Sequence, residues 1–222
     1  TEVETSYYGE PEMVSQALLS LSSIAEKDGD LSEALDHAVE LVDRFPENPA
    51  ILRSARRRIR RQASVYAEDL VLKGETGMAI KVYRQLLSQE PDDVVAHRQL
   101  ISLLAARGRE QEGVKIYKAM LDGRPGDDLA MYLYGLALTY LKPPSHFEKA
   151  LKMIQQALVV NPQLPFAHQT QGWIYEQMYH LQNYESGLER AAESYQAALS
   201  LLDTRSYPRA GANLLLNLGN VN

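Results

Sequence analysis

The length, composition and charge of the chain describe an ordinary folded protein. It has 222 residues, of which 45% are hydrophobic and 23% are charged, and its formal net charge is -6. This composition excludes a disordered or membrane-embedded chain, and no apolar run is long enough to cross a bilayer. The acidic balance argues against nucleic acid as the main partner.

Cysteine is absent from the sequence. Its absence excludes disulfide bonds, thiolate metal sites and a cysteine nucleophile. It is compatible with the bacterial periplasm and with the cytoplasm, and weakly favours the periplasm. The chain begins at Thr1 without a Met and ends within a helical pattern, so we expect it to be part of a longer protein.

A four-residue frame recurs five times along the chain. The frame begins with a small residue, and its second residue lies four positions later. An apolar residue follows three positions after that. The last residue, five positions further on, ends the helix and is Pro in four of the five copies. These offsets place the first three side chains on one face of a helix. The five copies are Ala34, Ala38, Leu41 and Pro46; Ala79, Tyr83, Leu86 and Pro91; Gly113, Tyr117, Met120 and Pro125; Ala150, Ile154, Ala157 and Pro162; and Ala191, Tyr195, Ala198 and Asp203.

Another helical pattern precedes each copy of the frame, and a sixth such pattern ends the chain. In the first three hairpins a Gly separates the two helices, at Gly29, Gly74 and Gly108. A Gly at this place supplies the left-handed conformation that ends the first helix. The residue pairs that mark the first helices are Leu21-Ser22, Tyr66-Ala67, Leu100-Ile101, Tyr134-Gly135, Gln171-Gly172 and Leu218-Gly219.

Each pair of predicted helices closes with a stop residue, and the closing prolines Pro91 and Pro125 are 34 residues apart. This pattern resembles the tetratricopeptide repeat. The resemblance covers repeats at about 12–46, 49–91, 92–125, 127–162 and 164–203, with a partial one at 208–222. It implies an all-α fold, a right-handed superhelical solenoid of antiparallel helix hairpins that forms one domain over 1–222. The Trp of the consensus is missing, and the residues in its place are Leu18, Ala63, His97, Met131 and His168.

The end of the chain departs from the repeat in two ways. The fifth hairpin carries extra residues around 177–187, enough to lengthen its arms or to form a protruding loop. An exposed apolar end favours self-association, so we expect contacts between copies of the chain at the last helix. The leucines that lack a covering second helix there are Leu214, Leu215, Leu216 and Leu218.

The geometry of the family aims one set of side chains into a concave groove lined by the first helices. Aromatic, amide and Arg side chains suit an extended peptide or a helix because they combine contact area with directional hydrogen bonds. The alternative is that Leu136, Phe166 and Trp173 are partly core; for the groove as a whole we favour binding. The residues expected in the partner-binding groove are Arg61, Arg98, Tyr132, Leu136, Phe166, Gln169, Trp173, Asn213, Asn217 and Asn220.

A basic patch occupies one predicted helix and could grip phosphates, acidic lipid or an acidic peptide. Its members are Arg53, Arg56, Arg57, Arg58, Arg60 and Arg61. The preceding helix carries acidic residues that could neutralise the patch, namely Glu33, Asp36, Glu40 and Asp43. Because charge runs are usually solvated faces, we favour internal neutralisation over a binding role.

Nothing in the sequence indicates catalysis. The His residues are scattered, and we find no phosphate-binding Gly loop, nucleophile elbow or paired-carboxylate motif. His97 and His168 occupy a packing position of the repeat, which favours a role in the core or at the groove rim. We therefore expect no enzyme, no catalytic residue, no metal and no cofactor.

The sequence predicts a non-catalytic scaffold that binds a peptide or helix of a partner protein in the groove, with the Arg-rich helix as a second site for acidic partners. The resemblance suggests a bacterial envelope or secretion assembly as one setting. The alternative is a regulatory or substrate-selecting arm of a larger enzyme whose catalytic domain lies outside this sequence. An RNA-binding helical repeat is disfavoured by the acidic balance and by the absence of a repeated base-reading pair. We expect no membrane insertion.

Overall fold

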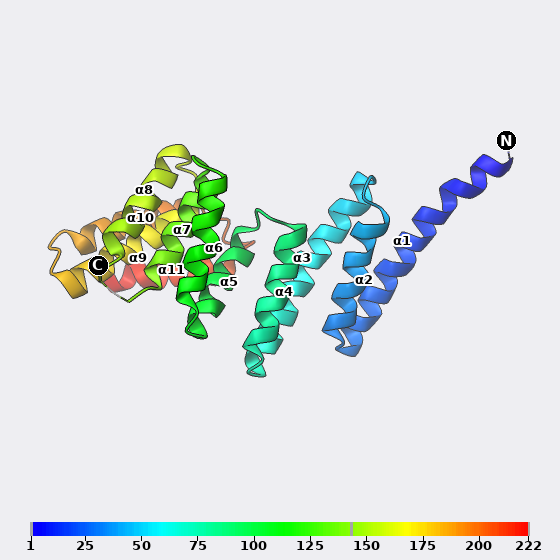
Figure 1. Cartoon of the computed structure of the whole chain (residues 1–222), viewed down its shortest axis with the longest axis horizontal. Helices are drawn as coiled ribbons and strands as arrows, with labels where there is room; N and C mark the ends of the chain where they lie inside the picture. The colour runs from blue at the N-terminus through cyan, green and yellow to red at the C-terminus, as the bar shows by residue number, and fades with distance from the viewer. Residues whose placement is uncertain (1, 143, 222) are drawn as a thin grey trace. The chain divides into compact units, whose positions relative to one another are not determined.

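All secondary structure in the described part of the chain is helical. The computed structural model describes residues 2–142 and 144–221, with side chains from residue 12 onward. The prediction of an all-α fold built from helix hairpins is confirmed (Figure 1). The helices are α1 (Glu2–Asp28), α2 (Leu31–Arg44), α3 (Pro49–Leu72), α4 (Thr76–Gln89), α5 (Val94–Ala106), α6 (Glu110–Gly123), α7 (Asp128–Thr139), α8 (Phe147–Val160), α9 (Pro165–Gln182), α10 (Gly187–Leu201) and α11 (Pro208–Val221).

The helices form two compact units, Thr1–Leu103 and Leu104–Asn222, with the boundary inside α5. In the first unit, α1 packs against α2, α2 against α3, and α3 against α4. In the second unit, each helix from α6 to α11 packs against the next, and α7 also contacts α9. Packing between sequence neighbours is typical of repeat proteins, in which each hairpin buries its apolar face against the next. No described helix has the length and apolarity needed to cross a membrane.

The small residues of the recurring frame are buried where neighbouring helices pack together. Ala34, Ala79, Ala150 and Ala191 are all completely buried. A methyl side chain at these points lets two helix backbones approach closely. After Ala79, Ala150 and Ala191, an aromatic or branched residue four positions later fills the space beside the contact. Tyr195 is such a residue and is itself fully buried. Burial of a large apolar side chain contributes about 1.5–3 kcal/mol, so the frame supplies much of the stability of each hairpin.

Residues with positive φ end several of the first helices. Gly29, Gly74 and Gly108 have φ angles of 84°, 80° and 65°, which confirms the left-handed turns predicted for the first three hairpins. In the fifth hairpin Asn183 takes this role, with a φ of 53° at the end of α9. Asn tolerates the left-handed region better than most residues, which explains why this turn does without Gly.

Two glycines in first helices mark points where the second helix lies too close for any side chain. A Cβ added at Gly172 would lie 2.7 Å from the ring of Tyr195 and 3.1 Å from the carbonyl oxygen of Ala191. A Cβ added at Gly135 would lie 2.9 Å from the Cδ1 atom of Ile154. The matching position in α11, Gly219, has nothing within 4 Å of such a Cβ. No described helix therefore covers this face of α11.

The leucines of α11 divide between the two sides of the helix. Leu214 is buried and Leu218 is half-buried, because both face the core that α9 and α10 share with α11. Leu215 and Leu216 remain 60% and 64% exposed. The expectation that all four leucines lack cover is therefore corrected, since Leu214 and Leu218 pack inward.

Candidate binding surfaces

Two residues of the predicted groove lie in the interior of the second unit. Tyr132 is 1% exposed and Leu136 is 8% exposed. They belong to α7, in which every residue from Ala130 to Thr139 is buried. The reason is the apolar run of this helix, which α6, α8 and α9 contact from several sides. Tyr132 and Leu136 are therefore core residues, which corrects their assignment to an open groove.

Two aromatic residues of α9 lie at the surface of the core with one side accessible. Phe166 and Trp173 are half-buried and pack against the cluster that contains Tyr195. The Trp173 ring meets Phe147 edge to face, with centroids 5.7 Å apart, and the Phe166 ring meets Tyr207 in the same way at 5.5 Å. Edge-to-face contacts restrict ring orientation, so these two side chains present fixed apolar area.

Amide side chains lie on the same faces of α9 and α11. Gln169 is half-buried, about one turn from both Phe166 and Trp173 on α9. On α11, Asn213 and Asn220 are exposed and Asn217 is half-buried. In the described part of the chain, no hydrogen bond engages the side chains of these three Asn residues, so their donors and acceptors face solvent. We define the α9–α11 surface as Phe166, Gln169, Trp173, Asn213, Asn217 and Asn220.

The remaining two groove predictions, Arg61 and Arg98, lie in the first unit. Arg61 is exposed, and its Nη2 atom is 2.6 Å from Oε2 of Glu26 on α1. Arg98 is half-buried on α5. Both belong to the first unit, so neither is part of the α9–α11 surface.

Three of the six arginines of α3 form ion pairs with carboxylates of the same unit. Arg56 and Arg60 both contact Glu90, at 3.2 and 3.1 Å, and Arg60 also contacts Asp93 at 2.6 Å. Arg61 is paired with Glu26 as described above. Internal neutralisation is thus observed for three of the six guanidinium groups.

The neutralising carboxylates are not the ones predicted from α2. Glu33 and Glu40 lie close to His37 of their own helix, and Glu40 also pairs with Arg44 at 2.8 Å. Asp36 and Asp43 are exposed. These acidic residues lie on the side of α2 away from its buried alanines, so they do not contact α3. The partners come instead from α1 and from the segment between α4 and α5.

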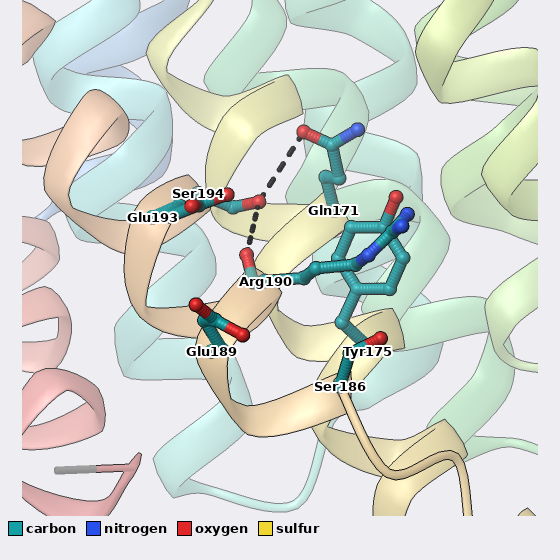
Figure 2. Close-up of a pocket in the computed structure, with 7 residues that line it drawn as sticks. All are labelled: Gln171, Tyr175, Ser186, Glu189, Arg190, Glu193 and Ser194. Carbon is teal, nitrogen blue, oxygen red and sulfur yellow. Dashed lines mark hydrogen bonds between the residues drawn. The ribbon is translucent and has the colours of Figure 1, made fainter.

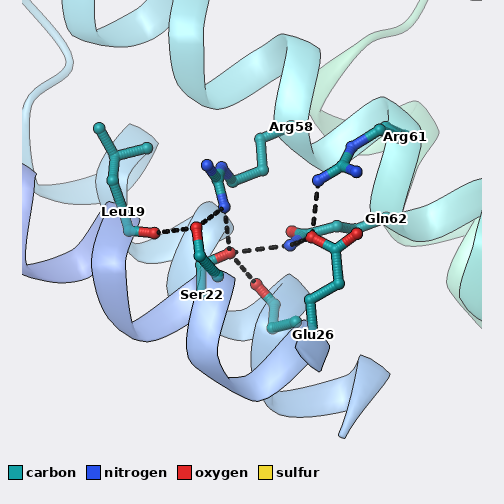
Figure 3. Close-up of polar contacts among 8 residues, drawn as sticks. Leu19, Ser22, Glu26, Arg58, Arg61 and Gln62 are labelled. Atoms are coloured by element: carbon teal, nitrogen blue, oxygen red, sulfur yellow. Dashed lines mark hydrogen bonds and ion pairs between the residues drawn. The ribbon is translucent and has the colours of Figure 1, made fainter. Parts of the chain in front are cut away.

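A polar network joins α1 to α3 (Figure 3). Nη1 of Arg58 donates to the Ser23 hydroxyl at 2.8 Å and lies 3.4 Å from the Ser22 hydroxyl. Nε2 of Gln62 donates to the same Ser22 hydroxyl at 2.8 Å and approaches Glu26 at 3.3 Å. Ser22 and Gln62 are buried, so the network fixes the pairing of the two helices.

A polar pocket between α9 and α10 was not predicted from the sequence (Figure 2). The Arg190 guanidinium lies 5.6 Å from the ring centre of Tyr175 and 5.7 Å from that of Tyr184, and the two rings stack 6.3 Å apart. The only signal in the sequence was the set of extra residues around 177–187, which lengthens this hairpin. The pocket is lined by Gln171, Tyr175, Ser186, Glu189, Arg190, Glu193 and Ser194.

The two histidines at the packing position make the same contact in two different repeats. Nε2 of His97 lies 2.8 Å from the carbonyl oxygen of Pro91, and Nε2 of His168 lies 2.9 Å from that of Pro162. Since a carbonyl oxygen only accepts, these nitrogens carry the proton and donate. The core position predicted for His97 is confirmed by its burial, and His168 is half-buried. Among the described residues, no group of three or more His, Asp or Glu is placed to hold a metal ion.

Helix pairs that pack in sequence order, with small residues at their crossings and left-handed turns at their ends, define a protein built from helical hairpin repeats. Residues 67–128 match the family model described as "Tetratricopeptide repeat". The match covers the end of α3 and the helices α4, α5 and α6, which is less than half of the chain.

Two solved structures are similar to the chain over most of its length. A thermophilic TPR protein of Thermus thermophilus, TTC0263, is 19% identical with a TM-score of 0.50; the match covers 91% of this chain and 99% of that one. MamA from Desulfovibrio magneticus RS-1 is 20% identical with a TM-score of 0.43, covering 85% of this chain and 94% of that one. At 19% identity the similarity to TTC0263 concerns the fold alone. No curated protein sequence matches the chain.

Proposed function

We propose that the whole chain is a tetratricopeptide repeat protein and that it is a non-catalytic scaffold, which binds a peptide or a helix of a partner protein. The α9–α11 surface is the proposed binding site. The observation that supports it is the combination of oriented aromatic rings at Phe166 and Trp173 with the solvent-facing amides of α11. Repeat proteins of this kind use extended surfaces of successive helices for recognition.

The two kinds of side chain have different roles in such a site. The half-buried rings offer apolar area whose orientation is already fixed, so little conformational entropy is lost on binding. The amides of Asn213, Asn217 and Asn220 repeat along one face of α11 at intervals of four and three residues. Each can donate to and accept from a peptide backbone, which suits an extended segment or the polar side of a helix.

A quantitative pull-down with three proteins tests this proposal. The unaltered chain is compared with a Gln169→Ala/Asn213→Ala/Asn217→Ala variant, which changes the surface without touching the core. The matched control is Gln85→Ala/Gln156→Ala/Gln196→Ala, because these three amides are exposed on second helices. Recovered proteins are quantified by mass spectrometry, and direct binding of the enriched partner is then measured with purified components.

The expected result is a partner that is retained by the unaltered chain and the control and lost from the surface variant by roughly tenfold, since several interfacial hydrogen bonds of about 0.5–1.5 kcal/mol each are removed. Equal retention by all three proteins would show that the α9–α11 surface is not the binding site. Loss from both variants would indicate a site elsewhere or a non-specific contact, and would also contradict the proposal.

A further inference from the structure

The six arginines of α3 separate into two groups by their partners. Arg56, Arg60 and Arg61 each contact a carboxylate, as described above. Arg53 and Arg57 are exposed, and no described side chain forms a hydrogen bond or an ion pair with either of them. Among the described side chains, the hydroxyls of Ser22 and Ser23 hold Arg58, and they carry no charge. We call Arg53, Arg57 and Arg58 the basic trio.

The hydroxyls that hold Arg58 are themselves fixed, which orients its guanidinium (Figure 3). The Ser23 hydroxyl donates to the carbonyl oxygen of Leu19 at 2.8 Å, and the Ser22 hydroxyl donates to that of Ala34 at 2.8 Å. Both therefore present lone pairs to Arg58, and no described carboxylate forms an ion pair with it. An Arg side chain ordered in advance loses less conformational entropy when it binds an anion.

The spacing of the trio fits carboxylates on a polypeptide. Arg53 and Arg57 are four residues apart on a helix, which corresponds to about 6 Å along its axis. Acidic residues four apart on a partner helix have the same spacing, and alternate residues of an extended segment lie about 6.8 Å apart. The chain has a net charge of -6, so it repels other anions at long range. This repulsion weakens the binding of a long phosphate polymer more than the binding of a short acidic segment that contacts the trio alone.

We propose that the basic trio is a docking site for an acidic segment of a partner protein, recognised through Asp or Glu carboxylates. Arg58 fixes the position of one carboxylate, and Arg53 and Arg57 bind others along the exposed face of α3. The site belongs to the first unit and does not involve the α9–α11 surface. It is independent of the scaffold proposal above, and the two proposals can fail separately.

Fluorescence anisotropy with a labelled ten-residue Glu/Asp peptide tests the site. The unaltered chain is compared at low salt with Arg53→Gln/Arg57→Gln/Arg58→Gln and with the single Arg57→Gln variant, since the Arg57 side chain forms no hydrogen bond or ion pair with a described residue. The matched control is Lys81→Gln/Lys115→Gln/Lys152→Gln, which changes the net charge equally through three exposed lysines on other helices. A single-stranded oligonucleotide of equal charge serves as competitor.

The trio variant is expected to bind the peptide about tenfold more weakly than the unaltered chain, because each exposed ion pair accounts for roughly two- to fivefold in affinity. Arg57→Gln should lose roughly two- to fivefold, and the lysine control should stay within about twofold. Equal weakening of the trio variant and the control would overturn the proposal, because it would indicate long-range charge alone. Absence of binding to the unaltered chain, or tighter binding of the oligonucleotide than of the peptide, would also overturn it.

Discussion

The phenol of Tyr195 donates a 2.7 Å hydrogen bond to Oε2 of Glu176. Tyr195 is fully buried on α10 and Glu176 is half-buried on α9, so the bond joins the two helices of the fifth hairpin. Burial raises the pKa of the Tyr195 phenol above its ordinary value, and the bond to Glu176 raises it further. The phenol therefore remains protonated and acts as the donor across the pH range in which proteins are usually studied.

Replacement of this donor tests its contribution to stability. Tyr195→Phe keeps the ring and removes the hydroxyl, so the Glu176 carboxylate loses a partner and regains only part of its hydration. We expect the free energy of unfolding to fall by about 1–2 kcal/mol, measured by urea denaturation followed by circular dichroism. Tyr207→Phe is the control, because it removes a hydroxyl near the surface and keeps the ring contact with Phe166. If Tyr195→Phe is as stable as this control, the hydrogen bond from Tyr195 to Glu176 does not contribute to stability as expected.

The buried tyrosine of the second hairpin predicts a loss of stability at high pH. Burial, with smaller contributions from Glu68 and Asp93, raises the pKa of Tyr83 to about 12. Since the ordinary value is about 10, the folded state holds this proton more tightly than the unfolded state. The resulting stability is complete below about pH 10 and is lost as the pH rises through 12.

Urea denaturation between pH 8 and pH 11 measures this effect. At pH 11 the contribution of Tyr83 should have fallen by roughly 1 kcal/mol, and in Tyr83→Phe this part of the pH dependence should be missing. Tyr140 is exposed, so Tyr140→Phe should leave the pH dependence of the free energy of unfolding unchanged. If unaltered protein and Tyr83→Phe lose stability in parallel, Tyr83 does not titrate as described.

The glycines of the first helices allow a matched comparison. Gly172→Ala would place a methyl group 2.7 Å from the Tyr195 ring, and we expect a loss of about 1–3 kcal/mol in the free energy of unfolding. Gly219→Ala meets open space on a helix, so it should leave stability unchanged or raise it by up to about 1 kcal/mol. Thermal and urea unfolding measure the free energy of unfolding of the two variants and of the unaltered chain. Similar losses from both would show that α11 is covered in solution.

The exposed leucines of α11 predict self-association of the chain. Leu215→Ser/Leu216→Ser removes the apolar area that remains uncovered there. We expect the unaltered chain to associate with increasing concentration in sedimentation equilibrium, and the variant to associate at least about tenfold more weakly.

The control is Val159→Ser/Val160→Ser, which changes two exposed apolar residues of α8 in the same unit. It should associate like the unaltered chain. A chain that remains monomeric up to about 0.1 mM would contradict this prediction, and equal weakening of both variants would place the contact elsewhere.

The fold followed from the sequence because its determinants are local. The recurring small residues, the turn glycines and the two packing histidines act within a hairpin or on the next one, so spacing along the chain predicts their positions. Burial was predicted less well. Tyr132 and Leu136 occupy groove positions of the repeat, yet the apolar character of all of α7 makes them core residues.

The partners of charged side chains were not predictable from spacing. Arg60 bonds Glu90 and Asp93 because the rotation of α3 about its axis turns this side chain toward the segment between α4 and α5. That rotation depends on which residues of α3 are buried, and the acidic residues of α2 gave a plausible alternative. The pocket around Arg190 depends on the length of α9 and on the stacking of Tyr175 with Tyr184, neither of which belongs to the repeat.

Packing between sequence neighbours also bears on how the chain folds. In each unit most contacts connect successive helices, and the contacts of α7 with α9 and the polar network between α1 and α3 are of longer range. The contact order is therefore low, and little loop-closure entropy opposes the first contacts. Hairpin formation needs no distant segment to be in place, so folding can begin at any hairpin with a complete frame and spread to its neighbours, and we expect refolding within milliseconds.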